Sequence, residues 1–282
     1  MPDFMKASFR RSSWIARITF LEAIRQRFFA FLILLSAALV LSSVAFRFLD
    51  FGHGELKFVT DFGLGGIFFF GSILSLVMTV QLFFAEIENR TALTLLAKPV
   101  GRGEFLIGKF VGVMAVLGIF IFTLSLLLGL VLWGRHQELV AAAEEAGRVS
   151  PDLSMMGLAA HAWLQWVRLG VIVAMVLMIA SVARTFLFAV VVGALALLAG
   201  QLQWIAQEAL IRDKGLGFLQ EAGLWLITRV VPNLQQFNIG DALALDASSV
   251  VAGAVWAATY SGLIYIAVFL ALAALGFRRR EI

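Results

Sequence analysis

Apolar residues in this 282-residue chain gather into long runs that are separated by polar segments. A helix needs about 20 apolar residues to cross a hydrocarbon core roughly 30 Å thick, and the runs have about that length. Lipid cannot satisfy exposed backbone groups, and the runs lack the alternation of a membrane barrel, so helices are expected. The pattern predicts six spans, at residues 28–46, 64–84, 106–133, 163–182, 185–205 and 250–277.

A second periodicity precedes the first span. Trp14, Ile18, Leu21 and Ile24 recur at helical spacing, whereas Arg17 lies off this stripe. A basic amphipathic helix of this kind lies flat at the membrane interface. We therefore expect a connecting helix at residues 12–27, which serves either as an anchor for the first span or as a contact for a partner.

The composition agrees with an all-α integral membrane protein. Hydrophobic residues make up 61% of the chain and charged residues 14%, and the mean hydropathy is +0.96. Soluble proteins average about 45–50% apolar and roughly 25% charged residues. We therefore expect residues 1–282 to form a single transmembrane domain. Cysteine is absent, which excludes disulfides and thiolate chemistry.

The basic residues predict orientation rather than nucleic-acid binding, because they cluster beside apolar spans. With the N-terminus inside, 14 of the 22 Lys and Arg residues fall in inner segments, and 8 fall in or beside outer ones. Both termini are therefore expected in the cytoplasm. The residues before the first run are polar and basic, without a cleavage signal after that run, so we expect a permanent span there.

The connection between the second and third spans is a polar segment at residues 86–104, which this topology places in the cytoplasm. Its acidic start caps the second span, "TALTLLAK" predicts a short helix with one apolar side, and a proline ends that helix. Such a helix, tied to both spans, is suited to docking a partner. The residues expected to couple the protein to that partner are Glu86, Glu88, Arg90, Leu93, Leu96, Lys98, Pro99 and Arg102.

This stretch carries a family resemblance. "EIENRTALTLLAKPVGRGEFLIGKFVG" resembles the cytoplasmic segment of ABC-2 type permeases, the membrane subunits of ATP-binding-cassette transporters, and is closest to the NosY-like bacterial branch. "ARITFLEAIRQRFF", "VPNLQQFNIGDAL" and "FRRREI" resemble, in the same order, the connecting helix, the segment before the last span and the C-terminal end of that family.

The resemblance implies a permease subunit in a bacterial inner membrane. It implies a second permease subunit, identical or homologous, and two separate ATP-binding subunits that hold ATP and magnesium, with no cofactor on this chain. It also implies that the apolar outer segment 206–249 is a re-entrant helical pair, and Pro232 should break its helix. The function it implies is ATP-driven export, or extracytoplasmic handling, of a substrate; a purely mechanical role stays open.

Residues Gly103 to Lys109, "GEFLIGK", match most of a phosphate-binding loop. The next residue is Phe110 instead of the serine or threonine that holds magnesium, and the segment leads into a membrane helix rather than following a strand. We therefore reject a nucleotide site. Lys109 is expected to reach the lipid headgroups as an interfacial anchor.

Arg168 is the charge nearest to a membrane interior, where a charge costs about 2.5–3.5 kcal/mol. Two interpretations are open for it and for Gln201: snorkelling to the outer interface, or lining a translocation path, for example with Arg168 near Asp61. His136 and His161 lie in or near the long outer segment 134–162 and are expected to be solvated, and a metal-binding pair is the less favoured alternative.

Two other classes of function were weighed. An intramembrane enzyme would need paired catalytic groups, and neither H-E-x-x-H nor G-x-S-x-G occurs. A stand-alone secondary transporter or channel would usually carry buried ionisable groups or broken helices. The spans are mostly unbroken and nearly free of charge, which favours a non-enzymatic permease subunit, with the stand-alone transporter or channel as the alternative.

Overall fold

The computed structural model describes residues 2–43, 55–88, 101–146, 153–212, 217–239, 244 and 252–278. Every regular element within these residues is a helix, as the apolar runs predict. The elements are α1 (Pro2–Ile24), α2 (Arg27–Ser42), α3 (Glu55–Glu88), α5 (Arg102–Ala146), α6 (Met155–Val182), α7 (Phe186–Arg212), α8 (Phe218–Val230), the 3-10 helix η3 (Leu234–Phe237) and α10 (Ala252–Arg278).

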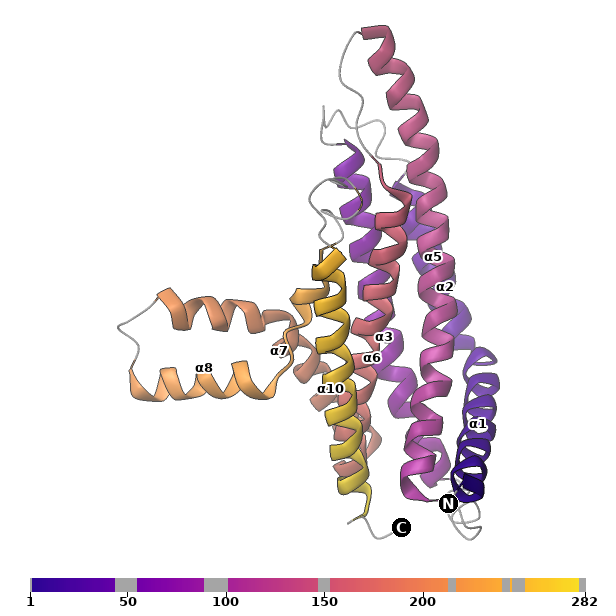
Figure 1. Ribbon diagram of the computed structural model, residues 1–282, viewed down its shortest axis with the longest axis vertical. Coiled ribbons are helices and arrows are strands. Elements are labelled where there is room, and N and C mark those ends of the chain that lie inside the picture. The colour runs from indigo at the N-terminus through magenta and orange to yellow at the C-terminus, as the bar shows by residue number, and fades with distance from the viewer. Residues whose placement is uncertain are drawn as a thin grey trace.

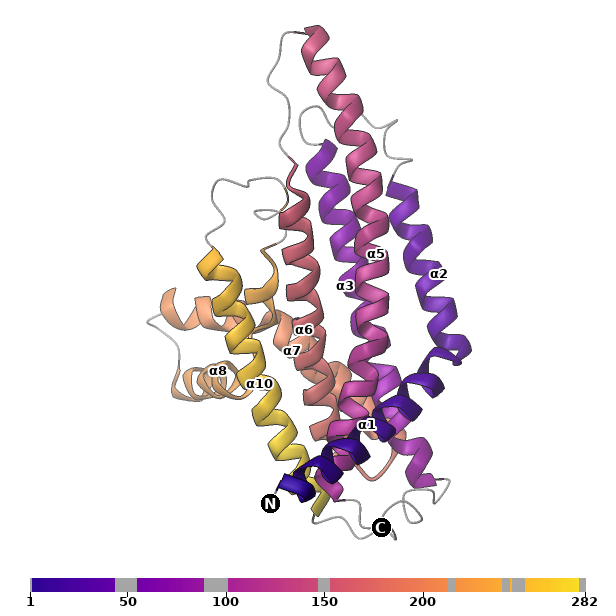
Figure 2. The ribbon, with the colours of Figure 1, turned by 45° about the vertical axis from the view of Figure 1, so that its right-hand side comes forward.

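Five helices in the described part of the chain are long and apolar enough to cross a membrane, namely α3, α5, α6, α7 and α10. A sixth span results if Arg10–Ile24 and Arg27–Ser42, which meet at a bend of 64°, count as one. The prediction of an all-helical protein with several apolar spans is therefore confirmed, and the number six stays a prediction. The start of α1 and the end of α10 lie at the same end of the bundle (Figures 1 and 2).

Helix α6 is the centre of the bundle. It packs against α3, α5, α7 and α10, and 78% of its apolar window is buried, compared with 22% for α7 and for α10. Two indoles of α6 tie it to its neighbours: Trp163 donates from Nε1 to Thr259 Oγ1 of α10 (3.2 Å), and Trp166 donates to the carbonyl of Met114 in α5 (2.9 Å). The exposed sides of α7 and α10 are therefore free to face lipid or another subunit.

Helix α5 covers the expected span 106–133 and continues to Ala146. Its 45 residues correspond to about 67 Å at 1.5 Å per residue, which is twice the thickness of a hydrocarbon core. The extension from residue 134 contains Ala141, Ala142 and Ala143, and alanine has the highest helix propensity. The polar continuation therefore projects beyond the bundle (Figure 1).

The segment after the fifth span contains two helical pieces. The end of α7 and helix α8 run antiparallel and project sideways from the bundle (Figure 1), and Gln203 Nε2 donates to the carbonyl of Thr228 (3.2 Å). Helix α8 ends at Val230, two residues before Pro232, as predicted. The chain then returns to the bundle through η3, where Leu234 and Phe237 are fully buried.

Helix α1 crosses the start of α5 at very short range, and two glycines make this possible. A Cβ on Gly108 would lie 2.7 Å from the Cβ of Ile15 and 3.0 Å from the carbonyl oxygen of Ser12. A Cβ on Gly112 would lie 2.6 Å from the Cβ of Thr19. Small residues spaced four apart allow helix backbones to approach in this way.

We predict that Gly112→Ala destabilises this crossing by about 1–3 kcal/mol, because the added methyl also meets the backbone oxygen of Ala16 at 2.8 Å. The measurement is the apparent Tm of the purified protein in mild detergent. Gly134→Ala in the same helix is the matched control, since nothing lies within 4 Å of the position of its Cβ. An equal Tm for both variants would contradict the close crossing.

Candidate functional site

The two helices that flank the expected coupling segment are joined by an ion pair. Glu86 lies in the last turn of α3, and Lys109 lies two turns into α5. Lys109 Nζ is 2.5 Å from Glu86 Oε1, and the Lys109 side chain is only 1% exposed. Its ammonium also lies 5.8 Å from the ring centroid of Phe105. The expectation that Lys109 is a headgroup anchor is therefore wrong, because the ion pair draws the side chain inward.

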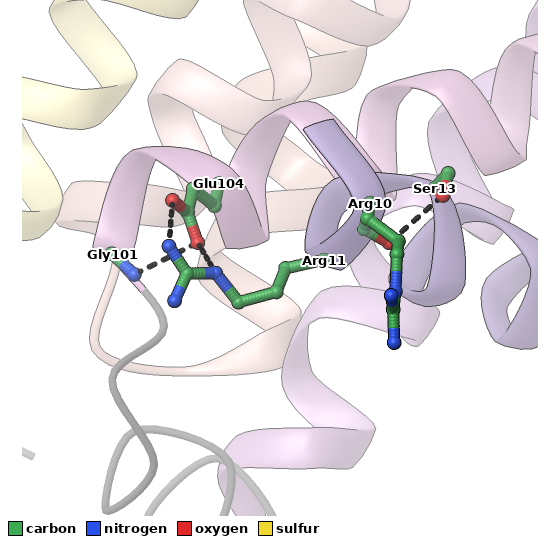
Figure 3. A network of polar contacts seen from close by, with 5 residues as sticks. All are labelled: Arg10, Arg11, Ser13, Gly101 and Glu104. Atoms are coloured by element: carbon green, nitrogen blue, oxygen red, sulfur yellow. Dashed lines mark hydrogen bonds and ion pairs between the residues drawn. The ribbon is translucent and has the colours of Figure 1, made fainter. Parts of the chain in front are cut away.

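A second ion pair attaches α1 to the start of α5 (Figure 3). The Arg11 guanidinium contacts Glu104 through two nitrogens, Nη2 to Oε1 and Nε to Oε2, both at 3.1 Å. Glu104 also accepts a hydrogen bond from the backbone N–H of Gly101 (3.3 Å), one of the donors that a helix start leaves without an internal partner. One carboxylate therefore fixes both the connecting helix and the first turn of α5.

Aromatic rings complete this junction. Phe105 of α5 stacks on Phe277 of α10 at 5.8 Å between ring centroids, and Phe83 of α3 meets Phe277 edge-on at 5.7 Å. Phe84 of α3 meets Phe186 of α7 edge-on at 6.3 Å. Such pairs contribute about 0.5–1.5 kcal/mol each beyond their buried area. These contacts lie at the end of the bundle that carries both termini, which we call its base. They join α3, α5, α7 and α10 there.

The junction has a mechanical consequence. Residues 89–100 connect the end of α3 to the start of α5, and both attachment points belong to the same packed unit. A close-packed interior responds to force by shifting whole elements rather than by deforming locally. A displacement of the connecting segment would therefore move α1, α3 and α5 together.

The expected coupling residues fall partly inside this junction. Glu86 is in the ion pair, Glu88 is the last residue of α3, and Arg102 is the first residue of α5. Arg90, Leu93, Leu96, Lys98 and Pro99 lie outside the described residues, so their assignment stays a prediction.

The structure brings Arg168 and Gln201 together inside the bundle. They lie 14 and 15 residues from the turn that joins α6 to α7, which places them at the same height, about 21–22 Å from that turn. Arg168 Nη2 donates to Gln201 Oε1 (2.6 Å), and the guanidinium lies 3.6 Å from the ring centroid of Phe68 on α3. Arg168 is 2% exposed.

Snorkelling of Arg168 to the outer interface is therefore wrong, because its partners hold it inward. Within the described residues its contacts are the amide of Gln201 and the face of Phe68, and neither Asp61 nor another carboxylate contacts it. A cation over an aromatic face gains about 2 kcal/mol when desolvated, and a hydrogen bond to a charged group contributes about 1.5–3 kcal/mol. These two contacts offset much of the cost of placing the charge there.

His161 and Gln165 continue this polar face of α6. They precede Arg168 by seven and three residues, and all three are buried. Gln165 Nε2 lies 3.0 Å from His161 Nε2. The expectation that His161 is solvated is therefore wrong. Among the described residues, no group of three or more potential ligands could hold a metal ion.

Several of these contacts could not be predicted from the sequence. Arg11 and Glu104 are 93 residues apart, and Phe68 is one of 26 phenylalanines. The spacing of Gly108 and Gly112 was a visible signal for close packing, but not for the identity of the helix that packs there. A periodicity check of the polar residues in the fourth span would have grouped His161, Gln165 and Arg168 on one face.

The helical bundle, with its five to six apolar spans, defines an integral membrane protein of the multi-pass class. A family model described as ABC-2 family transporter protein matches residues 13–282. The chain therefore belongs to the ABC-2 transporter family, whose permeases normally work with an ATP-binding subunit. Among curated proteins, no sequence matches the chain significantly.

We predict that Glu86→Gln lowers the apparent Tm more than the double change Glu86→Gln with Lys109→Met. The single change leaves a buried ammonium without its counter-charge, and breaking one side of a buried pair costs about 3–5 kcal/mol. A double-mutant cycle in mild detergent measures the coupling. Additive effects of the two changes would mean that the pair does not hold α3 to α5.

We predict that Gln201→Leu destabilises the bundle by about 1.5–3 kcal/mol, because it removes the acceptor of the buried Arg168 guanidinium. Gln207→Leu is the control, since that glutamine lies on the same helix and is exposed. Thermal unfolding of both variants, followed by circular dichroism, checks this. Equal stability of the two variants would remove Gln201 as the partner of Arg168.

Proposed function

We propose that this chain is the permease subunit through which ATP hydrolysis on a separate ATP-binding subunit drives export, or extracytoplasmic handling, of a substrate. The chain would have no catalytic centre of its own, and ATP and magnesium would be held by the partner. The family membership supports the permease role, and the packed junction at the base of the bundle supports the coupling.

The observation that carries the coupling is a pair of ionic contacts beside residues 89–100, one with a buried Lys109 and one partly buried. Glu86–Lys109 ties α3 to α5, and Arg11–Glu104 ties α1 to α5. A partner that binds the segment in two geometries would bias two arrangements of these helices through its differential contacts. Glu86 to Arg102 would thus receive the force, and the junction would transmit it.

The remaining assignments follow from the residues and the resemblance. The end of the bundle that carries α1 and Arg278 would face the cytoplasm, because basic residues concentrate there. The complex would contain a second permease subunit and would lie in a bacterial inner membrane. Within the family, the chain would belong to the NosY-like branch. Arg168 and Gln201 would lie in the outer half of the bundle, beside the translocation path.

The test is a pull-down of the tagged protein from its own host membranes in mild detergent. We expect a soluble ATPase, identified by photolabelling with azido-ATP, to copurify with the native chain and to be lost when residues 89–100 are replaced by a Gly/Ser linker. The Arg11→Ala variant should still bind the ATPase, but the permease should no longer stimulate ATP hydrolysis. The change removes the ion pair with Glu104, through which a movement of α5 would reach α1, and leaves residues 89–100 intact.

The linker replacement for residues 147–152, which lie in the chain between α5 and α6, is the matched control and should retain the ATPase. The proposal fails if no ATPase copurifies with the native chain. The coupling assignment fails if the ATPase remains bound to the chain that carries the linker at 89–100.

A further inference from the structure

Helices α5 and α6 enclose an apolar groove between the middle of α5 and the start of α6. Its volume is about 440 Å³, within the range of about 300–1,000 Å³ that is usual for small-molecule sites. Ten residues line it, and of their side chains only Ser125 and the indole of Trp133 carry polar atoms. Gly129 of α5 and Ala159 and Ala162 of α6 have small side chains, which leaves the space open between the two helices.

The groove has the length of one leaflet. Along α5 it extends from Phe122 to Trp133, and the eleven steps between these residues correspond to about 16 Å. Half of a hydrocarbon core is about 15 Å. Trp133 ends the apolar run, and its indole is 54% exposed, as is usual for tryptophan at a membrane interface. The groove therefore starts at the interface and ends near the middle of the bilayer.

The size of the groove indicates which kind of molecule can occupy it. Its volume of about 440 Å³ over a length of about 16 Å is well below the roughly 1,250 Å³ that a helix of this length and about 10 Å width would fill. A helix with its side chains is about 10 Å wide and would follow the flank of the bundle through both leaflets. A hydrocarbon chain is one methylene wide, with contacts between carbons at about 4 Å.

We propose that this groove holds one acyl chain of a membrane phospholipid from the leaflet on the side away from the termini. Phe122, Leu126 and Leu130 are 46%, 67% and 59% exposed and would border the chain on its lipid side. One turn beyond Trp133, the same face of α5 presents the exposed, uncharged Gln137 at headgroup level. The ten described residues that line the groove include no cation, so recognition is of the chain and not of the headgroup charge. The inference does not depend on an ATPase partner.

The test uses the full-length protein in vesicles of phosphatidylethanolamine and phosphatidylglycerol. One of the two lipids carries a photoreactive diazirine in the middle of one acyl chain, and peptide mass spectrometry maps the adducts. We expect adducts within residues 122–133 and 155–162, to the same extent with either labelled lipid. Ala159→Phe should lower this labelling at least about fivefold, because a phenyl ring fills the groove.

Ala267→Phe, at an exposed alanine on α10, is the matched control and should leave the labelling unchanged. Ser125→Leu fills the base of the groove and serves as a second variant, and each variant is first checked for monodispersity in detergent. Labelling that is equal in the native and filled proteins would show ordinary boundary lipid and overturn the proposal.

A second copy of the chain is the competing occupant. The protein has no cysteine, so Leu126→Cys gives a single thiol at the edge of the groove. Disulfide-linked dimers of this variant in vesicles, together with missing adducts on residues 122–133, would show that another subunit covers the groove and would also overturn the proposal.

Discussion

Hydrocarbon offers no partner for a backbone N–H or C=O group, and this constraint determines the architecture of the protein. Each apolar run must satisfy its own backbone, which only a helix can do within one segment. The same solvent removes the hydrophobic force between spans, so the helices associate through close packing and polar contacts. The approach of α1 to Gly108 and Gly112, and the indole hydrogen bond from Trp166 to the carbonyl of Met114, are contacts of these two kinds.

Charges within such a bundle take positions where other groups replace water. Lys109 does so with a counter-charge, Glu86, at the base of the bundle. Arg168 does so with neutral groups, an amide oxygen and an aromatic face. The two solutions have different consequences. The ion pair fixes the two helices that flank residues 89–100, whereas Arg168 holds α3, α6 and α7 together at the mid-length of α6.

Two features of the fold distinguish the end of the bundle that carries both termini, its base, from the other end. At the base, ion pairs and stacked phenylalanines join the helices into one unit that can transmit force. At the other end, α5 extends past the bundle, whereas the antiparallel pair of α7 and α8 projects sideways near its mid-height (Figure 1). The packed base is therefore the part of the fold in which the helices are most firmly joined, and the end of α5 and the pair of α7 and α8 extend away from it.

The apolar runs by themselves determined that the chain is helical and spans a membrane, because run length and the absence of alternation are local properties. The proline that ends α8 was readable for the same reason, and so was the family, from short motifs in a fixed order. Only the tertiary structure decided where Lys109, His161 and Arg168 point. Lys109 and His161 were expected to be exposed, and two interpretations were open for Arg168. Each of the three has a partner on its own or another helix, and a partner 23 or 33 residues away has no signature in a single sequence.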